Sequence, residues 1–487
     1  MITIDFSRRE NKGLCEYLYE SIKVQILSGE LRANEKLPSK RSLADHLGVS
    51  VITVQNAYSL LTVEGYLYSI EKKGFFVTDI KNDVTVKNHR NDREKLNESR
   101  SANERSLTKK KEESVFLADF SSNATGFEKF PFSLWAKTMR SVLASGNKNL
   151  LLKTETKGVF ELREAIAKHL YDFRQMRVSP EQIVIGAGTE SLYTMLIQLL
   201  GKKCRYAVEN PGYKKIASLF ALNGADCIPV ELDDEGINPL LLDKIGASVV
   251  HISPSHHFPT GIVMPIRRRN EILAWANGSS DELTNGRYII EDDYDSEFRF
   301  QGKPLPTLQS SDKNGRVIYI NTFTKTLAPS FRISYMVLPE SLLSRFEEKF
   351  RGFSSTVSAF EQFTLARFIS DGNFARHIIR MKNYYRSLRN ELISAFSKTK
   401  LSHVFKIHEE ESGLHFLLSF NLRETGLSAD IINERLLANK IKIPLLKDFY
   451  YTNVPKEKEN IFVVNYSGIQ KTSIKKIVEV IEKSLES

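Results

Sequence analysis

The chain has 487 residues, of which 41% are hydrophobic and 26% charged, and a formal net charge of +10 at pH 7. This length requires two or more hydrophobic cores, and the charge suits a polyanionic partner without requiring one, since many solvated surfaces carry similar charge. Three cysteines with no CxxC pair argue against a disulfide framework or a cysteine-built metal site. No apolar run is long enough to span a membrane and the first residues do not resemble a signal peptide, so we expect a cytoplasmic protein without a membrane partner.

The composition changes abruptly in the segment 81–113. This segment has few apolar residues, no aromatic residue and dense mixed charge, so it cannot bury enough surface to offset the entropy of ordering. We predict a flexible charged linker there, with one compact unit over residues 10–80 and a larger one over residues 114–487.

The first unit has the pattern of three short helices. An apolar residue at every fourth position predicts a first helix, formed around Leu14, Leu18, Ile22 and Ile26. Ser39 can cap a second helix, which Gly48 ends, and Ser50 can cap a third. Two helices joined by a tight turn that contains glycine form a helix-turn-helix unit.

The third helix and the segment after it carry groups that suit DNA. Thr53, Gln55 and Asn56 would point outward, where they can bond base edges or phosphates. Apolar runs at residues 66–70 and 75–77 flank the sequence EKKG, which predicts a hairpin whose basic tip touches phosphates.

The ordered motif LPSKRSLADHLGVS…TV…AY…L…EGY…GFFV resembles the winged helix-turn-helix domain of the GntR superfamily. That superfamily commonly has an arginine directly after the serine that opens the recognition helix, whereas this chain has Val51. We expect the DNA contacts to come from seven residues: Lys40, Arg41, Ser50, Thr53, Gln55, Lys72 and Lys73. A unit that only contacts other proteins is the alternative.

In the second unit, short apolar runs alternate with helical patterns. This alternation predicts an α/β fold with a mostly parallel sheet and ligands at the strand ends. The predicted strands are Ile183–Ile185, Tyr206–Val208, Val249–Ile252, Tyr288–Glu291, Val317–Asn321 and Ile333–Leu338.

Polar groups at two of these strand ends suit an aldehyde cofactor with a pyridine ring. Lys325 can form an imine if its amine is neutral, and Thr322 and Arg332 can bind a phosphate. Asp292 can pair with a protonated pyridine nitrogen, and Tyr294 can bond a phenolic oxygen of the ring. A divalent-cation site in the acidic loop is the alternative for the last two.

Three further strand ends add weaker signals. Gly188 and Thr189 open a helix whose free N–H groups suit a phosphate. Tyr213 can stack on a planar ring, although it can equally be a surface aromatic after a Pro-Gly turn. Adjacent His256 and His257 seldom point at one ion and no third ligand is evident, so we expect no metal.

The segments SPSHHFPTGIVMPI, EDDYDSEFRF and TFTKTLAPSFRISYM together resemble fold-type I, aspartate-aminotransferase-like proteins that bind pyridoxal 5′-phosphate. Joined to the winged helix, the chain resembles the MocR/GabR family of transcription regulators. The resemblance implies a head-to-tail homodimer in which each winged helix lies over the partner's large domain. It also implies site roles: Lys325 as the Schiff-base lysine, Asp292 on the pyridine nitrogen, Tyr294 on the phenolic oxygen, Tyr213 stacking, and Gly188, Thr189, Thr322 and Arg332 on the phosphate.

One departure from the family bears on function. Aminotransferases and members that sense amino acids bind the substrate carboxylate with an arginine near the C-terminus, where this chain has Val463. Val463 cannot form that bidentate clamp, although Lys215 could bind an acid group as a point charge. We therefore expect little or no transamination of α-amino acids.

The function that we expect is regulation of a double-stranded DNA operator, controlled by pyridoxal phosphate itself or by a small amine through the Lys325 Schiff base. Family members that regulate vitamin B6 synthesis provide the precedent for the cofactor as effector. A pyridoxal-phosphate-dependent aminotransferase with a DNA-binding domain remains an alternative, as does a repressor that needs no cofactor.

Overall fold

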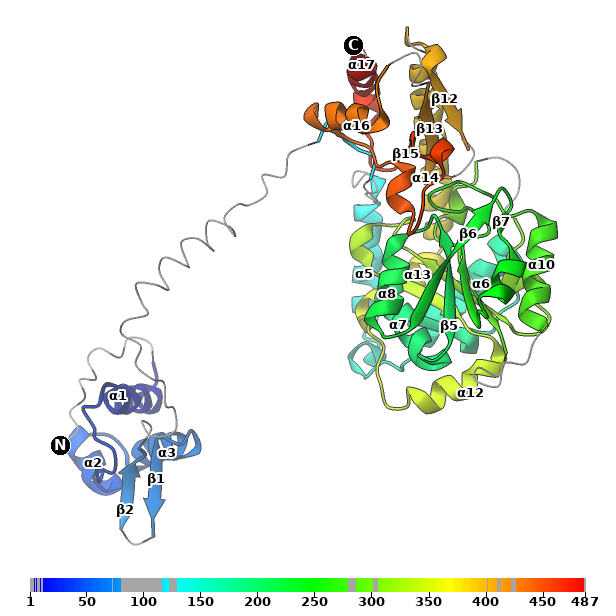
Figure 1. Ribbon diagram of the computed structural model, residues 1–487. Coiled ribbons are helices and arrows are strands. Elements are labelled where there is room, and N and C mark those ends of the chain that lie inside the picture. Colours follow the sequence, from blue (N-terminus) through cyan, green and yellow to red (C-terminus); the bar gives the residue numbers. More distant parts are fainter. Residues whose placement is uncertain are drawn as a thin grey trace. The chain divides into compact units, whose positions relative to one another are not determined.

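The computed structural model divides the chain into two compact units, Met1–Lys110 and Lys111–Ser487 (Figure 1). The residues it describes are 4, 6, 9, 12–71, 73–79, 116–121, 129–278, 286–300, 305–400, 402–409, 413–421 and 426–485. The predicted linker, residues 81–113, lies outside them. No helix in these ranges is both long and apolar enough to cross a membrane.

The N-terminal unit has the predicted helix-turn-helix and hairpin. Its elements are α1 (Leu14–Ser28), α2 (Lys40–Leu47), α3 (Val51–Val63), β1 (Leu67–Ile70) and β2 (Gly74–Val77), with β1 and β2 antiparallel. The predicted caps are confirmed: the Ser39 hydroxyl accepts a hydrogen bond from Ser42 N at 3.2 Å, and that of Ser50 accepts one from Thr53 N at 3.1 Å. Gly48 ends α2 with φ 65°, a left-handed conformation that glycine adopts without strain.

The apolar stripe of α1 holds the three helices together. Leu18, Ile22 and Ile26 are buried against residues of α2 and α3, which include Leu43, Val54, Tyr58 and Leu61. Leu14, which the four-residue spacing placed in the same stripe, is instead 38% exposed because it opens the helix at the edge of this core.

The C-terminal unit is built on an eight-stranded sheet in the order β4-β11-β10-β9-β8-β5-β6-β7. Its strands are β4 (Ile183–Gly186), β5 (Arg205–Asn210), β6 (Asp226–Asp233), β7 (Gly236–Ile237), β8 (Val249–Ile252), β9 (Tyr288–Asp292), β10 (Val317–Thr322) and β11 (Ser334–Val337). Only β11 and β7 run antiparallel to their neighbours. The carboxyl ends of β4, β10, β9, β8 and β5 therefore meet at one edge, where ligands of α/β folds bind.

Helices cover both faces of this sheet because successive strand residues point to opposite sides. One face packs against α7 (Thr189–Leu200), α8 (Lys214–Leu222) and α12 (Glu340–Lys349). The other packs against α6 (Phe160–Arg174), α9 (Pro239–Lys244), α10 (Ile266–Asn277), α11 (Leu308–Ser311) and α13 (Ala359–Ser370). The helix α5 (Phe132–Ala144) contacts α13. The prediction of an α/β fold with a mostly parallel sheet is confirmed.

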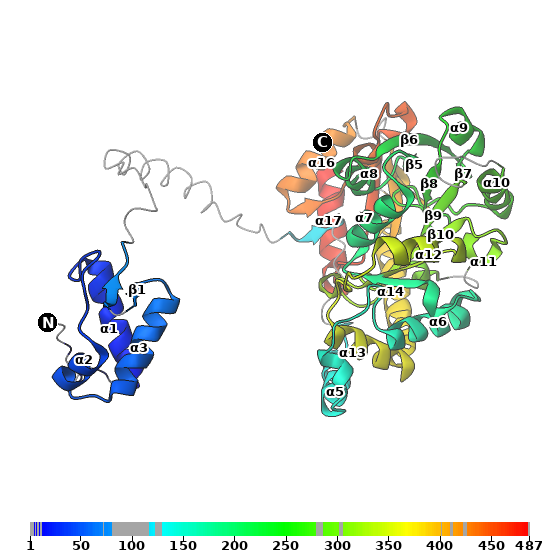
Figure 2. The ribbon, with the colours of Figure 1, turned by 90° about the horizontal axis from the view of Figure 1, so that it is seen from below.

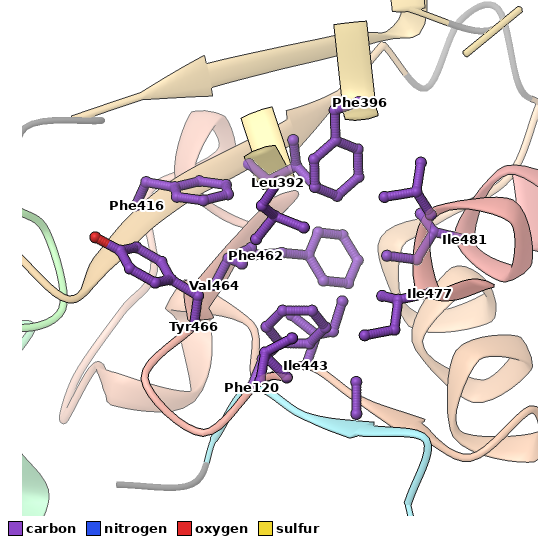
Figure 3. Close-up of a cluster of buried hydrophobic side chains, with 14 of the residues drawn as sticks. Phe120, Leu392, Phe396, Phe416, Ile443, Phe462, Val464, Tyr466, Ile477 and Ile481 are labelled. Carbon is purple, nitrogen blue, oxygen red and sulfur yellow. The ribbon is translucent and has the colours of Figure 1, made fainter. Parts of the chain in front are cut away.

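A second, smaller core lies at one end of this unit and is called here the C-terminal subdomain (Figures 1 and 2). It contains the antiparallel sheet β12-β13-β15, namely β12 (Phe405–His408), β13 (His415–Phe420) and β15 (Ile461–Asn465). The surrounding helices are α14 (Asn373–Ser397), α16 (Ala429–Ala438) and α17 (Ile474–Leu485). Buried aromatic and aliphatic side chains fill the space between them, among them Phe120, Phe416 and Phe462 (Figure 3).

The first described residues of the C-terminal unit belong to this subdomain. The strand β3 (Ala118–Asp119) pairs in parallel with β14 (Ile441–Lys442), and Leu117 N donates to the Lys440 carbonyl at 2.8 Å. With Phe120 buried in the core, this segment is fixed to the C-terminal subdomain rather than to the eight-stranded sheet.

Candidate functional site

A cavity of about 330 Å³ lies at the carboxyl edge of the eight-stranded sheet. Seven of the eight residues predicted to bind the cofactor line it: Thr189, Tyr213, Asp292, Tyr294, Thr322, Lys325 and Arg332. The eighth, Gly188, lies against the Arg332 side chain. Residues that are up to 144 positions apart in the sequence are therefore brought to one site by the strand order.

Lys325 follows β10 and is only 8% exposed. Burial lowers its pKa to about 8, although the Asp295 carboxylate acts in the opposite direction. About a tenth of the Lys325 side chain is therefore a neutral amine at pH 7, far more than for an unperturbed lysine, and the neutral amine is the nucleophilic form.

Asp292 ends β9, and Tyr294 follows two residues later. Asp292 Oδ2 accepts a hydrogen bond from the Tyr193 hydroxyl at 3.2 Å and lies 3.5 Å from His251 Nε2. Asp292 Oδ1 and the Tyr294 hydroxyl are buried without a hydrogen-bond partner among the described residues. Burial raises the pKa of Tyr294, and neighbouring carboxylates add to this effect. Two unpaired buried polar atoms in a pocket wall are costly unless a ligand or water pairs with them.

The predicted phosphate residues lie together at the start of α7. Gly188 has φ 81°, and a Cβ there would lie 2.2 Å from Arg332 Nη2, so only glycine lets the guanidinium approach this turn. Thr189 begins the helix, whose first N–H groups have no partner within it. The Thr322 hydroxyl, from β10, is hydrogen-bonded to Ser334 Oγ at 2.8 Å.

Glu190 is a pocket residue that the sequence did not single out. Its carboxylate accepts hydrogen bonds from Arg332 Nη2 and from Lys215 Nζ. Lys215, considered as a binder of an acid group, is thus paired with an acid of this chain. An acid in the first turn of a helix is commonplace, so no sequence signal distinguished it.

The two adjacent histidines point at different partners. His256 Nδ1 donates to Asp295 Oδ1 at 2.7 Å, whereas His257 Nδ1 is hydrogen-bonded to Thr260 Oγ1 at 2.6 Å. His257 Nε2 lies 3.4 Å from Glu209, a buried acid whose pKa burial raises to about 8. Within the described ranges, no group of three or more His, Cys, Asp or Glu side chains could hold a metal ion.

The remaining pocket wall is largely apolar and aromatic. Tyr213 is 45% exposed, and its ring centroid lies 6.3 Å from that of Phe258 at 82°. His415 opens β13, donates to the Pro259 carbonyl at 3.1 Å, and was missed because it belongs to no recognisable motif. These side chains leave the Tyr213 ring accessible for stacking.

Val463 lies in β15. It is 1% exposed and packs in a cluster with Leu417, Leu446 and Tyr450. Asn465, two residues later on the same strand, lines the cavity. Position 463, where the resemblance places the family's arginine, thus holds a buried apolar side chain.

In the N-terminal unit, four of the expected DNA contacts are exposed: Arg41, Ser50, Gln55 and Lys73. Asn56 is exposed as well. Lys40 is partly buried, with its Nζ 5.3 Å from the centre of the Phe75 ring. Lys72 lies outside the described residues.

Two of the expected contacts, Ser50 and Thr53, also stabilise the helix. Thr53 is partly buried, and its hydroxyl is hydrogen-bonded to that of Ser50 at 2.8 Å. Of the first turn of α3, the most exposed side chain is Ile52, at 71%. This apolar residue was not among the expected contacts because hydrogen-bonding side chains alone were considered.

Comparison with known proteins gives two family matches. Residues 14–77 match the bacterial regulatory proteins of the gntR family, and residues 117–481 match aminotransferase class I and II. An uncharacterized HTH-type transcriptional regulator, YdeL of Bacillus subtilis, is 37% identical over 421 residues, which cover 86% of this chain and 87% of the relative.

A second relative is the probable rhizopine catabolism regulatory protein MocR of Rhizobium meliloti, 31% identical over 407 residues, or 83% of this chain and 81% of the relative. Among solved structures, an archaeal alanine:glyoxylate aminotransferase matches with a TM-score of 0.66 and 21% identity over 78% of this chain and 93% of that one, which shows the fold alone. With its gntR-type unit followed by an aminotransferase class I and II unit, the chain belongs to the MocR/GabR family of transcription regulators.

Proposed function

We propose that this regulator binds pyridoxal 5′-phosphate in its C-terminal unit and that ligand binding there controls the affinity of the winged helix-turn-helix for an operator. The observation that carries the proposal is the convergence of Lys325, Asp292 and Tyr294 on one cavity. An amine of lowered pKa and two unpaired buried polar atoms have no evident structural purpose in a pocket wall.

The residues present fit the cofactor. The unpaired Asp292 Oδ1 would accept from the pyridine N–H, and the unpaired Tyr294 hydroxyl would donate to the phenolic oxygen. Arg332, beside the space that Gly188 leaves open, would bind the phosphate together with Thr189 and Thr322. Pyridoxal phosphate, when bound, supplies an aldehyde that reacts with amines and a ring that withdraws electrons.

Each residue has a defined task in this proposal. Lys325 would present its neutral amine to the aldehyde, and Asp292 would hold the proton on the pyridine nitrogen. Tyr213, on an accessible part of the wall, would stack on the ring. His251 and Tyr193 keep the Asp292 carboxylate oriented through its second oxygen.

The effector would be pyridoxal phosphate itself or a small amine that competes with Lys325. Val463 and its apolar neighbours provide no clamp for the carboxylate of an amino acid. For the same reason an aminotransferase activity is the weaker candidate. Mixing the protein with L-alanine and 2-oxoglutarate, and measuring pyruvate, tests that alternative directly.

The DNA contacts would come from Lys40, Arg41, Ser50, Thr53, Gln55, Lys72 and Lys73, together with the exposed Ile52. A head-to-tail homodimer would place two such units on one operator, and the segment 81–113 would join them to the ligand-binding units. The ligand must bind two states of that dimer with different affinity, because only differential binding can shift the equilibrium between them.

The first test is a visible absorption titration of the purified chain with pyridoxal phosphate. Wild type should develop a band above 400 nm that Lys325→Ala lacks, while Lys202→Ala, which removes an exposed lysine outside the cavity, should keep it. Binding of duplex DNA selected in vitro from a random library is then compared with and without the cofactor. Wild type without a band, or with a DNA affinity that the cofactor leaves unchanged, would refute the proposal.

A further inference from the structure

Glu190 places a carboxylate beside the residues that we propose for the phosphate. It lies in the first turn of α7, directly after the Gly188-Thr189 turn, and its side chain lines the cavity. One carboxylate oxygen accepts from Arg332 and the other from Lys215. Arg332 is the guanidinium that a phosphate would use, so a negative charge of the chain itself already lies on the phosphate's principal cation.

We propose that Glu190 competes with the phosphate group of the cofactor for Arg332 and thereby weakens cofactor binding. This inference rests on the proposed function of the cavity and concerns how readily the cavity fills. When phosphate binds, Glu190 must give up Arg332 and keep only Lys215. Lys215 thus provides the carboxylate with a second cation, so that its displacement from Arg332 does not leave it unpaired.

The charges of these three side chains favour competition. Partial burial tends to raise the pKa of Glu190, but the hydrogen bond from Lys215 and the charge of Arg332 outweigh it, so its pKa lies below the usual value. The carboxylate is therefore ionised at neutral pH and repels a phosphate dianion a few ångströms away. Arg332 and Lys215 are exposed and Glu190 is only partly buried, so water screens the repulsion and keeps it moderate.

Such competition would suit a sensor. A site that binds its ligand very tightly is filled at every concentration found in a cell and reports nothing. By lowering the affinity for the cofactor, the Glu190 carboxylate raises the cofactor concentration at which half of the sites are filled. It does so without altering Lys325, Asp292 or Tyr294.

The test compares wild type with Glu190→Gln, which keeps the shape of the side chain and removes its charge. Each is titrated with pyridoxal phosphate and with pyridoxal, which lacks the phosphate, and the Lys325-dependent absorption band is followed. Glu190→Gln should bind pyridoxal phosphate on the order of tenfold more tightly, and pyridoxal with unchanged affinity. Glu164→Gln, which removes an exposed acid of α6 outside the cavity, should bind both as wild type does.

Glu190→Asp, which withdraws the carboxylate by one methylene, should also bind pyridoxal phosphate more tightly than wild type, but by a smaller factor. The unfolding midpoint of each ligand-free variant checks that it folds. If pyridoxal phosphate binds wild type as tightly as, or more tightly than, both variants, the competition does not exist although the proposed function stands. An equal gain for pyridoxal would also refute it, because the phosphate would then not be the group repelled. If no form of the chain binds pyridoxal phosphate, the proposed function and this inference fail together.

Discussion

At the scale of single residues, the environment of Lys325 determines its chemistry. The same side chain on the surface would have a pKa near 10.4, and burial lowers it to about 8. Burial just beyond the end of β10 is the main cause of this shift, and the negative charge of Asp295 acts in the other direction. Lys325 is therefore reactive because the end of β10 places its amine in a buried position.

This environment predicts the pH dependence of cofactor capture. Only the neutral amine attacks an aldehyde, so the rate at which the absorption band forms should rise about tenfold per pH unit below pH 8 and level off above it. Stopped-flow absorbance from pH 6.5 to 10 measures the profile. Nα-acetyl-lysine in solution is the control, with a rate that continues to rise to about pH 10. A protein profile that follows this control would contradict the lowered pKa.

At the scale of elements, α3 combines a polar cap with an exposed apolar first turn. The hydroxyls of Ser50 and Thr53 stabilise the start of the helix. Ile52 contributes nothing to the core, being 71% exposed. In the major groove, apolar side chains contact the methyl group of thymine, and the N-terminal residues of a recognition helix are the ones that reach base edges.

We therefore predict that Ile52 reads a thymine methyl. On a duplex selected in vitro by the wild type, replacing thymines one at a time by deoxyuridine should weaken binding about two- to fivefold at one position per half-site. That loss should vanish in Ile52→Ala. Val63→Ala, at the other end of the same helix and 86% exposed, should retain it. Equal losses in all three proteins would show that Ile52 does not make the contact.

Among the longer strands of the eight-stranded sheet, those that were predicted are largely buried, whereas β6, which was missed, is half-exposed. All six predicted strands overlap observed ones, and four of these observed strands are buried along their whole length. β6 was missed because it is half-exposed and contains Pro229, a residue that argues against a strand. Within the described sheet β7 pairs only with Leu232 and Asp233, so Pro229 lies where β6 has a neighbour on one side alone.

The residues of the candidate site also fall into those that the sequence predicted and those that it missed. Lys325, Asp292 and Tyr294 were found because each follows a recognisable buried strand and belongs to a motif. His415 and Asn465 come from the C-terminal subdomain, whose contact with the cavity depends on tertiary packing that no local pattern encodes. Glu190 was adjacent to a predicted residue, but its pairing with Arg332 spans 142 positions and is visible only in three dimensions.

At the scale of the whole molecule, the C-terminal unit buries an unusual number of carboxyl groups around its sheet. Burial raises the pKa of Glu209 and Glu297 to about 8 and that of Glu291 to about 7. In the unfolded chain these groups release their protons near pH 4.5. Between these values the folded state binds more protons than the unfolded state, so the free energy of unfolding must fall as pH rises.

The decrease in the free energy of unfolding should be measurable between pH 7 and 8. Buried histidines such as His257 have a lowered pKa and produce the opposite trend below about pH 6.5. Lys325, whose pKa is lowered to about 8, also opposes the decrease as the pH approaches 8, but it is one group against three carboxyls. Each carboxyl that is still protonated contributes on the order of 1 kcal/mol per pH unit. Urea unfolding of the ligand-free chain should show the decrease, and Glu297→Gln should make it shallower. A free energy of unfolding that stays level or increases would contradict these pKa directions.

The pairing of β3 with β14 determines where the chain enters the C-terminal unit. Leu117 moves with the C-terminal subdomain, because its backbone N–H donates a hydrogen bond to the Lys440 carbonyl and Phe120 is buried in the core of that subdomain (Figure 3). A rotation of this subdomain about the eight-stranded sheet would therefore displace the end of the segment that leads back to the DNA-binding unit. A rearrangement confined to the sheet would leave that end in place. The C-terminal subdomain, which contributes His415 and Asn465 to the cavity, is thus also the part to which the segment from the N-terminal unit is attached.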